Sequence, residues 1–114
     1  MKRKVSHALH DILVAIERIE SVTQQKSLTE FEADWQLAYI VQRAIEIVSE
    51  ASRAIPADLQ AARPEIPWRQ VMAIGNVLRH EYHGLSDKVI WGVVTDELPK
   101  LKVAIAAIVE MVKE

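Results

Sequence analysis

Apolar residues recur every three or four positions along most of this chain, which is the spacing that places them on one side of an α-helix. Residues 5–23 show this spacing most clearly. The apolar residues of that stretch are Val5, Leu9, Ile12, Ile16, Ile19 and Val22. The sequence contains no convincing alternation of apolar and polar residues between turn residues, so β-strands are not expected. The pattern therefore predicts an all-α fold, an up-down bundle of four to five helices.

A second long helix is predicted from the polar break at residues 24–27 to about residue 54. Ser27 or Thr29 can cap its N-terminus, and acidic Glu30 favours a first helical turn. The apolar residues form two stripes, Phe31, Trp35, Ala38, Val41, Ile45 and Val48 on one and Leu37, Ile40, Ala44, Ile47 and Ala51 on the other. Because the stripes cover more than one narrow face, this helix is expected to be central in the bundle and shared with a second copy. The pattern thus predicts a homodimer.

An irregular connector and a third helix are predicted for the middle of the chain. The connector covers residues 56–67 and is expected to hold a short helical turn at residues 57–62. The helix that follows covers residues 67–83, with Pro67 in its first turn, where the missing N–H costs nothing. Gly75 lies in the middle of this helix, and a glycine there indicates close approach by another helix.

Two further helices are predicted for the last third of the chain. Gly84 is expected to end the third helix as a left-handed cap, and Ser86 to cap a short helix after it. Asp96 is the predicted N-cap of the last helix. The core stripe of that helix is Leu98, Leu101, Ile105, Ile108, Val109 and Val112.

Composition narrows the classes of function. A length of 114 residues fits one domain, and a chain without cysteine forms no disulfide and no thiolate site. No window approaches 18 uncharged apolar residues, and the basic residues 1–4 are not followed by the apolar region of a signal peptide, so we expect a cytoplasmic protein with no membrane span. The net charge is −2, which means that any contact with RNA must be local or built from two subunits.

The third helix carries two different faces. Steps of three and four residues place Arg69, Asn76, His80 and His83 on one stripe. The opposite stripe is mostly apolar and consists of Val71, Ile74, Leu78 and Tyr82. Imidazole and guanidinium groups on one face are suited to holding a phosphate and moving a proton.

These side chains fit the cleavage of RNA without a metal. RNA supplies its own nucleophile, the 2′-OH, and His80 can act as acid or base near neutral pH. Arg69 or Arg79 can stabilise the charge that develops on phosphorus. Asn76, one turn before His80, can orient the imidazole or donate to a phosphate oxygen. The two histidines could share a metal, but the sequence suggests no further ligand, so neither a metal site nor a cofactor is predicted.

The spacing Asn76-x-x-x-His80-x-Tyr82 forms part of a longer pattern. It is followed by Gly84, Trp91 and the run Asp96-Glu97-Leu98-Pro99-x-Leu101. This combination, together with the length and the order of the helices, resembles the HepT-like branch of the HEPN superfamily. The resemblance implies one HepT-like HEPN domain over residues 1–114, which forms a homodimer whose active faces meet in a cleft.

The resemblance also implies a function. HepT-like proteins are toxins of type VII-like toxin–antitoxin pairs and cleave RNA without a metal, with His80 as the catalytic histidine. Their expected partner is an MntA-type minimal nucleotidyltransferase, which uses ATP to AMPylate the motif tyrosine, here Tyr82. A charged adenylate at that position would block the cleft and repel RNA phosphates. Glu81 and His83 are expected to line the same cleft.

One position departs from the family motif, which has an arginine five residues before the histidine. In this chain that position is Gly75. On an ideal helix Arg79 points about 100° away from His80, and Arg69 lies about 16 Å from it along the axis. The alternative hypothesis is therefore a non-catalytic HEPN dimer that binds a nucleotidyltransferase partner or a nucleotide. The third hypothesis is a helical dimer with a purely structural role.

Overall fold

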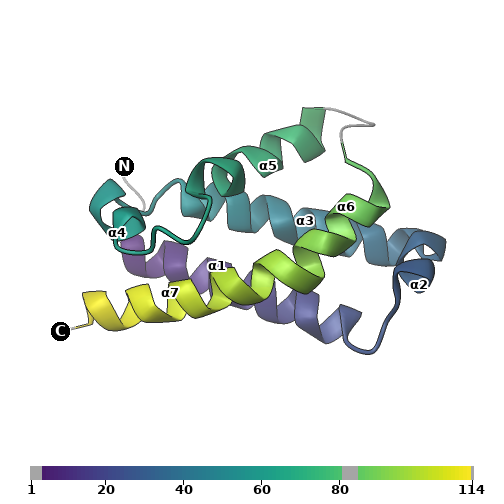
Figure 1. The fold of residues 1–114 in the computed structure, drawn as a ribbon, viewed down its shortest axis with the longest axis horizontal. Helices are drawn as coiled ribbons and strands as arrows, with labels where there is room; N and C mark the ends of the chain where they lie inside the picture. Colours follow the sequence, from purple (N-terminus) through teal and green to yellow (C-terminus); the bar gives the residue numbers. More distant parts are fainter. Residues whose placement is uncertain (1–3, 81–84, 114) are drawn as a thin grey trace.

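Long and short helices alternate along the chain in the computed structural model, which describes residues 4–80 and 85–113 (Figure 1). The long helices are α1 (Val5–Thr23), α3 (Trp35–Ser52), α5 (Trp68–His80) and α7 (Leu98–Val112). The short helices are α2 (Leu28–Ala33), α4 (Ala57–Ala61) and α6 (Asp87–Gly92), and the π-helix η1 (Val93–Glu97) joins α6 to α7. The described residues form no strand, so the all-α class is confirmed for this part of the chain.

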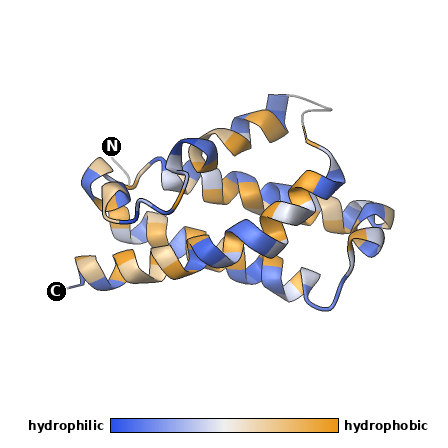
Figure 2. Ribbon diagram, viewed as in Figure 1, coloured by the Kyte–Doolittle hydropathy of each residue, from blue (hydrophilic) through white to orange (hydrophobic). Residues whose placement is uncertain are grey.

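The core lies where α1 packs against α3 and α7. The inward residues of α1 recur at the predicted spacing, and Leu9, Ile12 and Ile16 are almost completely buried. Figure 2 shows that apolar and polar residues share each long helix, as expected for helices that bury one side. At the surface, the Lys102 ammonium donates to the Glu20 carboxylate at 2.8 Å and joins α7 to α1. That hydrogen bond raises the pKa of Lys102.

The predicted continuous helix from residue 28 to residue 54 is wrong, because the chain breaks at Asp34. The backbone of Asp34 is extended, and its side chain accepts hydrogen bonds from the N–H groups of Gln36 and Leu37, which caps α3. The Ser27 cap before α2 is confirmed. The break rotates α3 relative to α2, so that Phe31 is buried whereas Trp35, predicted on the same core stripe, is 67% exposed.

The predicted helix start at Asp96 is also wrong. Helix α6 continues through η1 into α7, and the Leu98 N–H donates to the carbonyl of Val93 in the wider π pattern. Asp96 lies inside this continuous arm, where the preceding turn already pairs the backbone N–H groups that an N-cap would bind. The Ser86 cap of α6 is confirmed, with its hydroxyl accepting from the Val89 N–H.

No helix within residues 4–80 and 85–113 combines the length and the apolar character needed to cross a bilayer.

Candidate active-site face

Helix α5 is anchored firmly at its start. The Trp68 side chain is buried, and its indole N–H donates to the carbonyl oxygens of Gln60 at 2.9 Å and Arg63 at 3.1 Å. These bonds tie the first turn of α5 to the connector that carries α4. Trp68 is therefore a packing residue, and so is Trp91, whose ring lies 5.1 Å from the ring of Phe31.

Gly75 is the point of closest approach between α5 and α3. The Ser49 hydroxyl donates to the carbonyl of Met72 at 3.0 Å and accepts from the Gly75 N–H at 3.0 Å. A Cβ atom on Gly75 would lie 2.8 Å from the Ser49 Oγ, too close for any unshifted side chain. The prediction that another helix approaches closely here is confirmed.

The predicted polar stripe of α5 faces outward. Arg69, Asn76 and His80 are all exposed, whereas the opposite residues Val71 and Ile74 are half-buried against the core. The structure therefore confirms a helix with one half-buried apolar face and one exposed face that carries an imidazole and a guanidinium.

Arg79 is drawn towards the histidine stripe by Asn76. Its Nη2 donates to the Asn76 Oδ1, and Asn76 lies one turn before His80 on the same stripe. This hydrogen bond ties the Arg79 guanidinium to a residue of the stripe that carries His80. The last described turn of α5 thus combines an amide, a guanidinium and an imidazole, all exposed. Arg69, eleven residues before His80, stays outside this cluster.

Three predicted site residues lie outside the described residues, namely Glu81, Tyr82 and His83. Their predicted roles remain predictions. Within the described ranges, no three histidine, aspartate or glutamate side chains lie close enough together to hold a metal ion.

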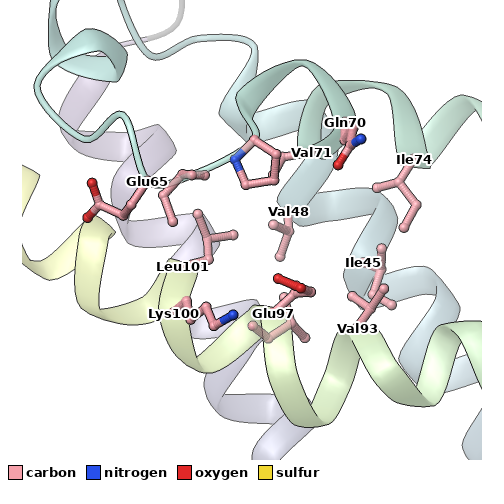
Figure 3. Close-up of a pocket in the computed structure, with 13 residues that line it drawn as sticks. Ile45, Val48, Glu65, Gln70, Val71, Ile74, Val93, Glu97, Lys100 and Leu101 are labelled. Carbon is pink, nitrogen blue, oxygen red and sulfur yellow. The ribbon is translucent and has the colours of Figure 1, made fainter.

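The surface has a cavity on another side of α5. It is a cavity of about 260 Å³ whose floor is Ile45 and Val48 of α3 and whose polar rim includes Glu97 and Lys100 (Figure 3). It was not predicted, because its walls come from α3, α5 and the α6–α7 arm, which are distant in sequence. None of the predicted catalytic residues lines it.

An exposed aromatic pair was also missed. Trp35 and Tyr39 of α3 form an edge-to-face contact with ring centroids 5.6 Å apart. The signal that could have revealed it is Asp34, a good N-cap residue in the middle of an apparently continuous helix.

Comparison with known proteins places this chain in a family. The sequence model of the family described as "Ribonuclease HepT-like" matches residues 12–108. The chain therefore belongs to the HepT-like ribonuclease family, as the resemblance implied. No solved structure matches it significantly.

Several relatives are similar over nearly their whole length. "Probable ribonuclease HepT" of Thermococcus cleftensis is 40% identical over 102 residues, which is 90% of this chain and 93% of the relative. "Putative RNase MJ1380" of Methanocaldococcus jannaschii is 35% identical over 101 residues, 89% of this chain and 93% of the relative. "Putative RNase TTE0752" of Caldanaerobacter subterraneus is 27% identical over 109 residues, 96% and 94% of the two chains.

The packing of Gly75 explains why this chain lacks the motif arginine. A guanidinium-bearing side chain at residue 75 would begin inside the contact with Ser49 rather than on the exposed face. The exposed arginine in the described part of α5 that lies next to His80 is Arg79, which bonds Asn76.

Proposed function

We propose that this protein is a metal-independent endoribonuclease that acts as the toxin of a toxin–antitoxin pair. The observation that carries the proposal is the exposed cluster of Asn76, Arg79 and His80 at the end of α5, in a chain of the HepT-like family. The names of the relatives support the reaction, because three of them are called ribonucleases or RNases.

In this reaction the ribose 2′-oxygen attacks the adjacent phosphorus, the new O2′–P bond forms and the P–O5′ bond breaks. The products are a 2′,3′-cyclic phosphate and a 5′-hydroxyl, and the 2′-OH proton is balanced by the proton that the 5′-oxygen receives. His80 would take or supply that proton as a general acid or base. Arg79, held by Asn76, would donate to the phosphate oxygens as their charge develops.

Regulation by AMPylation completes the proposal. We propose a homodimer whose two active faces meet in a cleft, and a minimal nucleotidyltransferase partner that transfers AMP from ATP to Tyr82. The tyrosine lies two residues after His80 in the sequence, so an adenylate there would add bulk and negative charge close to the phosphate-binding groups.

A second candidate function has one specific observation in its favour. Gly75 is buried and stands where the family motif has an arginine. Loss of one transition-state donor costs roughly 10²–10³ in rate. A dimer that binds the nucleotidyltransferase or a nucleotide without cleaving RNA would tolerate that loss.

Cleavage of RNA by the purified chain and by His80→Ala separates the two functions. We expect the wild type to cut single-stranded RNA in the presence of EDTA and to leave 2′,3′-cyclic ends, and we expect His80→Ala to be inactive. Arg79→Ala should lose roughly 10²–10³ in kcat. Arg69→Ala is the matched control, because Arg69 is exposed on the same helix but outside the cluster, and its kcat should stay near that of the wild type. Equal cutting by the wild type and His80→Ala would rule out the proposed mechanism.

AMPylation is tested by mass spectrometry after incubation with the nucleotidyltransferase and ATP. We expect one adenylate or more per chain on the wild type and none on Tyr82→Phe. The chain has only two tyrosines, and the other, Tyr39, is 68% exposed on α3. Tyr39→Phe is therefore the control and should be modified like the wild type. Modification that disappears in Tyr39→Phe instead would contradict the assignment.

A further inference from the structure

Two large aromatic side chains stand together on the surface of α3. Trp35 is 67% exposed and Tyr39 is 68% exposed, with their rings inclined at 75°. Aromatic side chains are amphipathic and frequent at binding surfaces, which makes an exposed pair a candidate contact surface for a ligand. Trp35 and Tyr39 belong to a regular helix that Asp34 caps, so their backbone is ordered without a ligand.

The position of the pair connects it to the candidate active site. Steps of four and three residues along α3 lead from Trp35 through Tyr39 and Gln42 to Glu46 and Ser49. The far end of this stripe is the surface on which α5 packs, since the Cβ position of Gly75 faces Ser49 and Glu46. The aromatic pair is therefore the uncovered continuation of the surface of α3 that contacts α5.

The facing stripe of α5 leads to Arg79. Met72 and Gly75 contact α3, and Arg79 is the next residue on that side of the helix. The two helices run in opposite directions and diverge towards this end (Figure 1), which leaves Arg79 exposed. At 1.5 Å per residue, His80 lies about 7.5 Å beyond Gly75, and Tyr39 lies about 10.5 Å beyond Glu46 in the same direction. The aromatic pair and the His80 cluster thus lie towards the same end of the α3–α5 pair.

We propose that Trp35 and Tyr39 form a stacking platform for the unpaired bases of a single-stranded RNA substrate, next to the phosphate that the His80 cluster holds. The inference rests on the proposed function, because it assumes that this cluster binds RNA. Stacking on aromatic rings tolerates any base and does not depend on a basic surface. This suits a chain whose net charge is −2. Arg43, one turn beyond Tyr39, is exposed and forms an ion pair with Glu46 at 3.6 Å, so the platform relies on stacking rather than on a free cation.

The aromatic pair alone is too small to form the interface of the proposed dimer, although it can line the cleft between two copies. A stable interface buries about 800 Å² on each partner. Two aromatic side chains with 150–250 Å² each, already one-third covered, offer roughly 200–300 Å². Ile40, the other exposed apolar residue of α3 nearby in sequence, is turned about 100° away from Tyr39 and does not extend the platform.

The experiment measures binding of a fluorescent single-stranded RNA with methylated 2′-oxygens, which cannot be cleaved by attack of the 2′-OH, by fluorescence anisotropy. Trp35→Ala and Tyr39→Ala are each expected to raise Kd roughly 5- to 150-fold, the range for one lost base–aromatic stack. Trp35→Phe and Tyr39→Phe keep a ring and should bind nearly as well as the wild type. Val103→Ala is the matched control, since Val103 is 66% exposed on α7, and its Kd should not change. Sedimentation of every variant reports whether the oligomeric state is kept.

Two results would overturn the platform. The first is a Kd that neither alanine variant changes. The second is a change of oligomeric state in either alanine variant, which would assign the pair to contacts between copies. Failure of the proposed ribonuclease is a separate result, because it is read from unmodified RNA. If the wild type binds methylated RNA through Trp35 and Tyr39 but cuts no RNA, the platform stands and the catalytic assignment falls. If the wild type cuts RNA while the alanine variants bind methylated RNA normally, the catalytic assignment stands and the platform falls.

Discussion

At residue 75 the chain has a glycine because α3 leaves no room for a side chain. The Ser49 hydroxyl occupies the position that a Cβ would enter, and it also bonds the backbone of α5 on both sides of the crossing. The absence of the motif arginine is thus a packing feature as well as a functional one. Arg79, held by Asn76, is the cation that remains near His80.

Replacing the two helical glycines tests this packing. Gly75→Ala should lower the free energy of unfolding by about 1 kcal/mol, because overpacking costs about 1–3 kcal/mol and better helix propensity returns about 1. Gly92→Ala is the control, since a Cβ there meets nothing within 4 Å, and it should raise the free energy of unfolding by about 0.5–1 kcal/mol. Urea unfolding measures both. Equal stabilisation by the two substitutions would show that the contact with Ser49 yields easily.

The helices themselves are separated by caps. Asp34 divides an apolar stretch into α2 and α3, and this division turns Trp35 out of the core and onto the surface. Asp96, a residue of the same type, sits inside a continuous arm and caps nothing there. The Asp34 carboxylate therefore sets where α3 begins, whereas the Asp96 carboxylate starts no helix.

Alanine substitutions at these two aspartates should differ in thermal and urea stability. Asp34→Ala removes a side chain that accepts from two backbone N–H groups at 3.1 Å, and the free energy of unfolding should fall by about 1 kcal/mol. Asp96→Ala should stay within about 0.5 kcal/mol of the wild type. Asp34→Asn keeps a capping oxygen and should recover most of the loss. A loss at Asp96 as large as that at Asp34 would contradict the continuous arm.

At the scale of the whole molecule, the proposed dimer raises the question of which subunit supplies each group. The Asn76–Arg79 hydrogen bond lies within one chain and ties the guanidinium to the residue one turn before the His80 of that chain. We therefore expect the two groups to act from the same subunit, although two such clusters meet in the proposed cleft.

Mixing two inactive variants distinguishes the possibilities. His80→Ala and Arg79→Ala chains, unfolded together and refolded as mixed dimers, should remain as inactive as either alone, because no subunit then carries both groups. Sedimentation should give twice the 12.9 kDa of one chain, which confirms that dimers have formed. Recovery of a substantial fraction of wild-type cleavage would show that the arginine acts across the interface.

Much of the fold follows from the sequence alone. The bounds of α1, the Ser27 and Ser86 caps, the short α4 and the two faces of α5 all depend on residues within one or two turns of each other. Local spacing and capping are sufficient for such features, because the interactions involved span four residues or fewer. The shared stripe of Asn76 and His80 was predicted for the same reason, since the two residues occupy consecutive turns of one helix.

The sequence by itself determined the helical class, the family and the identity of the chemical groups on α5. Only the tertiary structure decided that residue 75 is closed by Ser49 and that Trp35 and Tyr39 are left uncovered where α3 and α5 diverge. The physical reason is that periodicity states which side of a helix is apolar, whereas the distance and angle between two helices depend on side chains that meet from distant parts of the chain.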